Sequence, residues 1–177
     1  MIKIIFGLLM ALVCTTQGCI ADEEPNGVTL GVGDTLPEFS VTMSNGEAVT
    51  TPSLLGKVSV IVFFNTNCSD CQKELPVVQQ VWQYYQGNPN IVIVPIAREE
   101  GNDEILKYWE ENGLSMPYSP QETRDVYSLF APSIIPRIYI ANSNGLITAS
   151  FGDKDMPDYA AIVTAIEEAR FNSNQLQ

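Results

Sequence analysis

Two cysteines separated by two residues, Cys68 and Cys71, are the side chains in this sequence best suited to chemistry. They follow an apolar, β-branched run at 58–64 that is typical of a buried strand. The next apolar residues recur at three- and four-residue intervals, as on one face of a helix: Leu75, Val78, Val81, Trp82 and Tyr85. At a helix start, unpaired N–H groups and the helix dipole favour a thiolate. The pattern therefore predicts a reactive dithiol, with Cys68 as the exposed nucleophile and Cys71 as the resolving thiol.

Composition narrows the alternatives for this pair. The chain has 177 residues, 45% hydrophobic and 17% charged, which predicts one globular domain with a hydrophobic core. Its net charge of −12 argues against nucleic acid as a partner. The sequence has no histidine, which excludes His-dependent hydrolases, His-ligated metals and haem attached through a C-x-x-C-H motif. Because the other two cysteines, Cys14 and Cys19, lie near the N-terminus, we expect no zinc site and no other metal. A reactive dithiol needs no cofactor, and we expect none.

The N-terminus has the features of an export signal. Lys3 is followed by an apolar run at 4–13, which is too short to span a bilayer, so we expect a signal peptide at 1–18. The sequence before Cys19 resembles a bacterial lipobox, and we expect lipidation of Cys19 rather than plain secretion. Residues 19–30 form an acidic tether, whose acids at 22–24 are either a surface-export signal or a solvated linker. A lipid anchor would place the domain outside the cytoplasm on a bacterial membrane, periplasmic or surface-exposed, where disulfides persist.

The rest of the chain predicts a single α/β domain at 31–171, followed by a polar tail at 172–177. A hairpin turns at Asn45-Gly46. Further strands are expected at 58–64, 91–96, 137–141 and 146–151, and helices after the cysteines, at 102–112, at 122–130 and from Pro157 onwards. One mixed sheet covered by helices on both faces satisfies this order.

The motifs together resemble the thioredoxin superfamily, and within it the TlpA/ResA-like extracytoplasmic thiol-disulfide oxidoreductases. The resemblance covers roughly 31–169. It rests on Gly33-Asp34 with Pro37-Glu38-Phe39, Gly56-Lys57-Val58, Cys68 to Cys71 with Lys73-Glu74-Leu75-Pro76, Ile135-Pro136 and Asn144-Gly145. It implies a thioredoxin-like three-layer fold: a central mixed β-sheet with helices on both faces and an N-terminal β-hairpin. It also implies that the protein reduces disulfides in extracytoplasmic proteins.

The resemblance also implies roles for residues beyond the cysteines. Pro136 matches the family's cis-proline, and Ile135 before it would pair with the backbone of an extended substrate. Glu74 matches a partly buried acid close to the sulfurs. Burial should raise the pKa of Glu74 and let it relay the proton of Cys71; alternatively it is a favourable partner of the helix dipole.

Three residues depart from the family pattern. Asn67 precedes the first cysteine where the family usually has Trp, which removes a flat apolar docking surface. Ser69 and Asp70 replace the common Gly-Pro or Glu-Pro between the cysteines. The charge of Asp70 disfavours a neighbouring thiolate, so we expect a reducing couple and not an oxidant.

Other functions compete with disulfide reduction. A disulfide isomerase or oxidase of the same fold is one, and a non-catalytic binding module with a structural disulfide is another, although a disulfide closing so short a loop adds little stability. A peroxiredoxin would need Pro seven residues and Thr or Ser three residues before its cysteine, where this chain has Ile61 and Asn65. The partners of a reductase would be a disulfide-containing protein substrate and an upstream thiol reductant.

Overall fold

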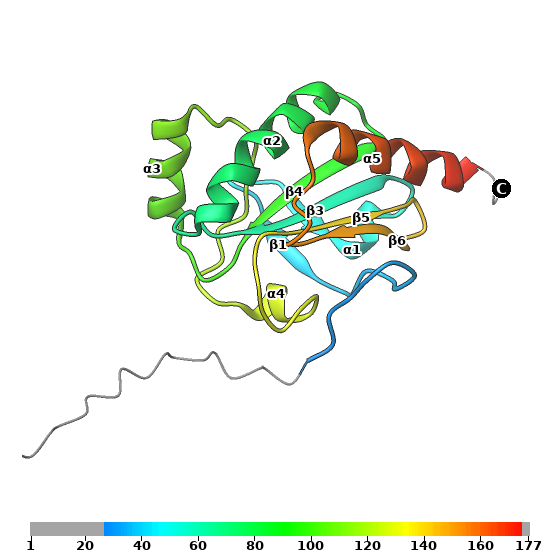
Figure 1. Cartoon of the computed structure of the whole chain (residues 1–177), viewed down its shortest axis with the longest axis horizontal. Helices are drawn as coiled ribbons and strands as arrows, with labels where there is room; N and C mark the ends of the chain where they lie inside the picture. Colours follow the sequence, from blue (N-terminus) through cyan, green and yellow to red (C-terminus); the bar gives the residue numbers. More distant parts are fainter. Residues whose placement is uncertain (1–26, 175–177) are drawn as a thin grey trace, which may run out of the picture.

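A four-stranded sheet with the order β4-β3-β5-β6 forms the centre of the protein (Figure 1). The computed structural model describes residues 27–174; the expected signal peptide, Cys19 and most of the acidic tether lie outside the described residues. Strand β3 (Val58–Phe64) pairs in parallel with β4 (Ile91–Ala97). On its other side it pairs antiparallel with β5 (Arg137–Ala141), which pairs antiparallel with β6 (Ile147–Phe151). The prediction of one mixed sheet is therefore confirmed.

Strand β3 is buried along its whole length because both faces of the sheet are covered. Successive side chains of a strand point to opposite faces, so this strand contributes to two hydrophobic clusters. Val60, Val62 and Phe64 belong to the cluster on one face, whereas Ile61 and Phe63 belong to the cluster on the other. The continuous apolar sequence of β3 reflects this two-sided burial.

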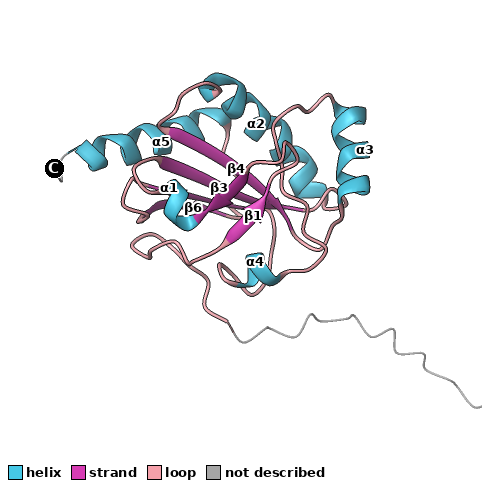
Figure 2. Cartoon of the chain, turned by 180° about the vertical axis from the view of Figure 1, so that it is seen from behind, coloured by secondary structure: helices cyan, strands magenta, loops and turns pink. Residues whose placement is uncertain are grey.

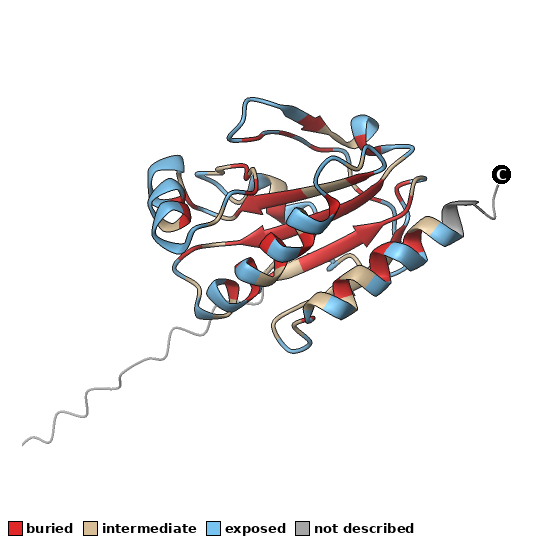
Figure 3. Cartoon of the chain, turned by 90° about the horizontal axis from the view of Figure 1, so that it is seen from above, coloured by how far each residue is buried: buried red, intermediate tan, exposed pale blue. Residues whose placement is uncertain are grey.

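Two long helices cover the first face of the sheet. Helix α2 (Ser69–Tyr85) and helix α5 (Tyr159–Asn174) lie side by side over the strands (Figures 1 and 3). In Figure 3 both show buried segments between exposed ones, as amphipathic helices do. Helix α3 (Asn102–Asn112) lies beside the start of α2 and ends at Gly113, whose positive φ of 64° suits a glycine. Helix α5 continues to Asn174, into the stretch predicted as a polar tail.

The opposite face is covered by shorter elements (Figure 2). They are the hairpin of β1 (Ser40–Thr42) and β2 (Ala48–Thr50), the single turn α1 (Thr51–Leu54) and the single turn α4 (Asp125–Ser128). The hairpin turns at Gly46 as predicted. Phe39 of the hairpin segment and Phe130 beside α4 pack edge to face, with ring centroids 5.5 Å apart. The expected three-layer arrangement is thus confirmed.

One predicted element was wrong in length. A helix at 122–130 was expected, with Val126, Leu129 and Phe130 facing inward, but α4 contains four residues. Residues 121–123 instead pair with the chain after β4: Gln121 exchanges two backbone hydrogen bonds with Glu100. Of the three residues expected to face inward, Phe130 is buried, Val126 is partly buried and Leu129 is exposed, while Tyr127, which was not expected there, is also buried. Among the helices in the described range 27–174, none combines the length and the apolar composition needed to cross a bilayer.

Candidate active site

Cys68 is the N-cap residue of α2. The polar residues Asn65 to Asn67 end β3 and the helix starts one residue after the cysteine, so the strand leads directly to the sulfur. The Sγ atom of Cys68 accepts a hydrogen bond from the Cys71 N–H at 3.4 Å and donates one to the Ile135 carbonyl at 3.7 Å. The side chain is partly exposed. An N-cap sulfur receives a backbone donor and faces the positive end of the helix dipole, both of which suit a thiolate.

Cys71 has a different environment one turn further along α2. It is fully buried in the cluster between α2 and the sheet. Burial, followed by its hydrogen bond with Cys68, raises the pKa of the Cys71 thiol far above its ordinary value. Both thiols are free in this structure. The two sulfurs therefore differ as predicted, one accessible and one shielded.

Ile135 and Pro136 lie opposite the cysteines. The Ile135–Pro136 peptide bond is cis, as expected from the resemblance. Pairing between β3 and β5 begins at Phe63 and Arg137, so the backbone of Ile135 lies outside the sheet. Among residues 27–174, no group accepts a hydrogen bond from the Ile135 N–H. This donor belongs to the residue whose carbonyl contacts Cys68 Sγ.

Side chains hold the loop before Pro136 at four successive carbonyls. Arg124 donates to the Pro132 oxygen at 2.6 Å and Arg137 donates to the Ser133 oxygen at 3.2 Å. The buried Tyr127 hydroxyl donates to the Ile134 oxygen at 2.6 Å, and Cys68 donates to the Ile135 oxygen. Ile134 itself has a φ of 73°, which is rare for a β-branched residue. This loop is therefore fixed by the surrounding side chains and not by regular secondary structure.

Glu74 lies one turn after Cys71 on the buried face of α2. It is 3% exposed, and its Oε1 atom has no hydrogen-bond partner in the described part of the chain. Burial raises the pKa of Glu74 to about 7. A buried carboxyl that titrates near neutral pH can take up and release a proton, as its expected role requires.

The two residues between the cysteines face solvent. Ser69 is exposed, and the Asp70 carboxylate pairs with the Lys73 ammonium at 2.7 Å. Lys73 therefore offsets part of the negative charge that Asp70 places near the sulfurs. Because both side chains are well exposed, water and salt weaken their effect further. The tuning role expected for Asp70 stays a prediction and should be small.

The sequence did not point to Thr66 and Glu100. The Glu100 carboxylate is buried and accepts hydrogen bonds from the Thr66 N–H at 2.7 Å and from the Thr66 hydroxyl. In the sequence, Glu100 is one of two adjacent acids in a loop, a pattern typical of solvent-exposed charge. Nothing in its spacing signals that it contacts a residue 34 positions earlier.

Arg98 brings a positive charge close to the thiols. It lies near enough to Cys71 to lower the pKa of that thiol, although burial has the larger, opposite effect. Its guanidinium also lies 5.2 Å from the centre of the Tyr127 ring. A peroxidatic site would use such an arginine, but the positions at Ile61 and Asn65 lack the proline and hydroxyl that it needs. The arrangement fits disulfide exchange better than peroxide reduction.

Comparison with known proteins agrees with this geometry. Residues 32–150 match the AhpC/TSA family. The thiol-disulfide oxidoreductase ResA of Bacillus subtilis is 22% identical over 162 residues, covering 89% of this chain and 90% of that protein. ResA of Geobacillus thermodenitrificans is 23% identical over 156 residues, covering 86% and 89%.

Solved structures show the same fold. A Bacteroides thetaiotaomicron protein classed as a protein disulfide isomerase superposes with a TM-score of 0.72 at 26% identity, covering 80% of this chain and 94% of that one. A thioredoxin-family thiol:disulfide interchange protein from Chlorobium tepidum gives 0.65 at 22%, covering 84% and 99%. The fold and the paired cysteines define a thioredoxin-fold dithiol protein. The chain belongs to the AhpC/TSA family and resembles its TlpA/ResA-like members, as the motifs indicated.

Proposed function

We propose that this protein is a thiol-disulfide oxidoreductase that reduces disulfides in extracytoplasmic proteins. The observation that carries the proposal is the unequal environment of the two thiols. Cys68 is accessible at the start of α2, whereas Cys71 is buried directly behind it. A structural disulfide requires no such difference, but a nucleophile and a resolving thiol do.

The reaction consists of two exchanges. The Cys68 thiolate attacks one sulfur of a substrate disulfide, forms a mixed disulfide and releases the other substrate sulfur as a thiolate, which takes up a proton. Cys71, after losing its proton, attacks Cys68 Sγ and releases the second substrate thiol. The substrate gains two electrons and two protons, and the protein is left with a Cys68–Cys71 disulfide. An upstream thiol reductant returns it to the dithiol form.

Ile135 and Glu74 support these exchanges. The free N–H of Ile135 pairs with the backbone of the substrate next to its disulfide, and Pro136 keeps the loop open there. Because burial strongly favours the protonated form of Cys71, the second exchange needs a proton acceptor. Glu74, with a pKa of about 7 and an unpartnered carboxyl oxygen, fills that role.

We further propose that the domain acts outside the cytoplasm, tethered by a lipid on Cys19. The lipobox-like residues before Cys19 support this, as does the apolar run at 4–13. The curated relative from Bacillus subtilis is a thiol-disulfide oxidoreductase with a similar length, so the whole domain is shared. Palmitate labelling of the full-length protein expressed in a bacterial host, lost in Cys19→Ala, tests the anchor.

The reduction potential of the Cys68/Cys71 couple tests the function. A midpoint near or below about −250 mV fits a reductase. A midpoint of about −120 to −180 mV would make it an oxidase or isomerase instead. The absence of any reversible two-electron couple would support a binding module. In parallel, Cys71→Ser should trap a mixed disulfide with a substrate protein, while Cys68→Ser, the matched control, should not.

A further inference from the structure

A buried carboxylate beside the cysteines has no part in the exchanges described above. Glu100, in the loop between β4 and α3, is 5% exposed. Its Oε2 atom accepts from the Thr66 N–H at 2.7 Å, and its Oε1 atom accepts from the Thr66 hydroxyl and from the Asn67 side-chain amide at 3.5 Å. A buried charge is costly unless it is hydrogen-bonded. Within residues 27–174, every hydrogen bond to the Glu100 carboxylate comes from Thr66 or Asn67, the two residues that directly precede Cys68.

The backbone before Cys68 forms one hydrogen-bonded turn, in which the Cys68 N–H donates to the Asn65 carbonyl at 3.1 Å, and side chains tie this turn to its neighbours. The Gln72 amide donates to the Thr66 carbonyl at 2.7 Å, which ties the segment to the first turn of α2. The Asn65 amide donates to the Arg98 carbonyl at 3.0 Å, which ties it to the end of β4. Glu100 supplies the charged contacts of this set, and charge-assisted hydrogen bonds are the stronger kind.

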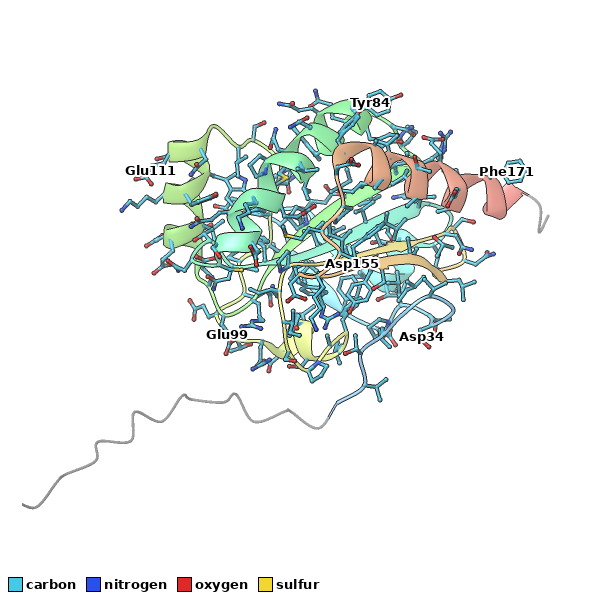
Figure 4. All side chains as sticks on the ribbon, in the orientation of Figure 1. Asp34, Tyr84, Glu99, Glu111, Asp155 and Phe171 are labelled. Atoms are coloured by element: carbon cyan, nitrogen blue, oxygen red, sulfur yellow. The ribbon has the colours of Figure 1, made fainter. Side chains whose placement is uncertain are left out.

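Glu100 also connects the turn before Cys68 to the loop before Pro136. Its backbone exchanges hydrogen bonds of 2.7 and 3.1 Å with Gln121, just before α4. From there the chain leads to Arg124 and Tyr127, which hold the Pro132 and Ile134 carbonyls. Figure 4 labels the neighbouring Glu99, on the same loop. The side chain of Glu100 thus contacts the segment that positions Cys68, and the backbone of Glu100 pairs with the segment that leads to the loop before Pro136.

We propose that Glu100 is a positioning residue for Cys68. Its carboxylate fixes Thr66 and Asn67, and this holds Cys68 Sγ opposite Ile135, where a docked substrate presents its disulfide. The inference rests on the proposed function and adds a residue to it. A protein disulfide bound along Ile135 needs the sulfur in one place. A small alkylating reagent approaches from any direction and needs only the thiolate.

The test compares these two kinds of reagent. Rates are measured for the reduction of insulin, with dithiothreitol as electron donor, and for the alkylation of Cys68 by iodoacetamide at one pH. Glu100→Ala should lower the insulin rate about 10-fold or more and change the iodoacetamide rate less than about 2-fold. Glu100→Gln should lose less insulin activity than Glu100→Ala, because its amide oxygen can accept from the Thr66 N–H and its amide nitrogen can donate to the Thr66 hydroxyl, although that nitrogen cannot accept from the Asn67 amide. Glu104→Gln, an exposed acid of α3, is the surface control.

A second pair of variants keeps the test independent of how well Glu100→Ala folds. Thr66→Val removes the hydroxyl contact at nearly constant shape and should slow insulin reduction, and Thr66→Ser should restore it. Circular dichroism verifies the fold of each protein. If Glu100→Ala is unfolded, the Thr66 pair decides.

Three outcomes would overturn the inference. One is a wild-type insulin rate in folded Glu100→Ala and Thr66→Val. The second is an equal loss with both reagents, which would mean that Glu100 acts on the thiolate. The third is a Glu100→Gln protein as slow as Glu100→Ala, because the hydrogen bonds to Thr66 that the amide can keep would then not account for the effect. A wild-type protein that does not reduce insulin would instead contradict the proposed function.

Discussion

The sulfur of Cys68 lies 3.7 Å from the carbonyl oxygen of Ile135, although 67 residues separate them in the chain. This contact joins the start of α2 to the loop before β5 and defines the face at which chemistry takes place. It also makes that face asymmetric. The nucleophile touches the proposed substrate-docking backbone, while Cys71 stays behind it in the hydrophobic cluster.

The asymmetry predicts selective alkylation. Because burial shields Cys71 and raises the pKa of its thiol, iodoacetamide at pH 8 should modify Cys68 in the folded, reduced protein and leave Cys71 unmodified. Peptide mass spectrometry measures this directly. Both cysteines should react after denaturation, which serves as the control. Equal labelling of the two in the folded state would contradict the assigned roles.

Glu74 predicts how stability depends on pH. Its pKa of about 7 in the fold lies above its ordinary value of 4.5, so the folded protein binds this proton more tightly than the unfolded chain does. The contribution of Glu74 to the free energy of unfolding is therefore greatest below pH 4.5, and it is lost as the pH rises through about 7. The loss amounts to about 3 kcal/mol. Glu74→Gln does not titrate and should not show it.

Urea unfolding at several pH values measures this difference. The gap in unfolding free energy between Glu74→Gln and the wild type should widen by about 3 kcal/mol in favour of the variant between pH 4 and pH 8. Glu168→Gln, at an exposed position of α5, is the control. Parallel curves for Glu74→Gln and the wild type would show that Glu74 does not titrate in this range.

The Glu74→Gln variant should also reduce insulin roughly 10-fold or more slowly at pH 7, because the proton acceptor for Cys71 is lost.

Asp70 and Lys73 predict small shifts of opposite sign in the reduction potential. Removing the negative charge in Asp70→Asn favours the thiolate and should raise the midpoint by about 10 mV. Lys73→Gln leaves Asp70 unpaired and should lower it by a similar amount. Equilibration with glutathione at low salt measures both. The shifts should shrink in 1 M salt, and a salt-independent change would point to altered structure.

A Tyr127→Phe variant tests how far the loop before Pro136 depends on the Tyr127 hydroxyl. Tyr127→Phe leaves the Ile134 carbonyl without its 2.6 Å donor and should cost about 1–2 kcal/mol of stability. Tyr139→Phe is the matched control: its hydroxyl donates to the Phe130 carbonyl, which also accepts from the Leu30 N–H. The control should therefore lose less. Thermal unfolding compares the two, and equal losses would contradict the importance of the Ile134 contact.

Peroxide consumption separates this protein from a peroxiredoxin. Because Ile61 and Asn65 occupy the positions where a peroxidatic site needs Pro and Thr or Ser, the reduced protein should oxidise in hydrogen peroxide no faster than a free thiol of similar exposure. Loss of free thiols with time measures the rate. Rapid, catalytic consumption would show that Arg98 and Cys68 form a peroxidatic site after all.

The elements next to the cysteines could be predicted because their signals are local. The β-branched run of β3, the polar break at Asn65 and the helical spacing after Cys71 all act within one stretch of sequence. The 102–112 helix was predicted with its bounds because Gly113 ends it. These features depend on backbone preference and periodicity, which the sequence carries directly.

The residues that the sequence did not reveal depend on contacts between distant segments. The 122–130 stretch has a helical pattern, but pairing of Gln121 with Glu100 competes for its first residues. Glu100 itself matters through Thr66, and Tyr127 through Ile134. Hydrogen bonds of this kind form only when distant segments pack together, so no pattern of residues in the sequence predicts them.

The edge of β4 has a consequence for how a substrate leaves. Close to the site, Ser119 donates to the Pro95 carbonyl at 2.8 Å and accepts from the Ala97 N–H at 2.9 Å, and Pro95 has no N–H to offer. The backbone of Ser119 therefore occupies the edge of β4 at residues 95–97, the end of the strand nearest the site. An incompletely folded substrate protein exposes strands, and an open sheet edge would pair with them through backbone hydrogen bonds. With Ser119 at this end of the edge, the proposed docking backbone of Ile135 and one covalent bond are the contacts that we expect to hold a substrate, and breaking that bond in the second exchange favours its release.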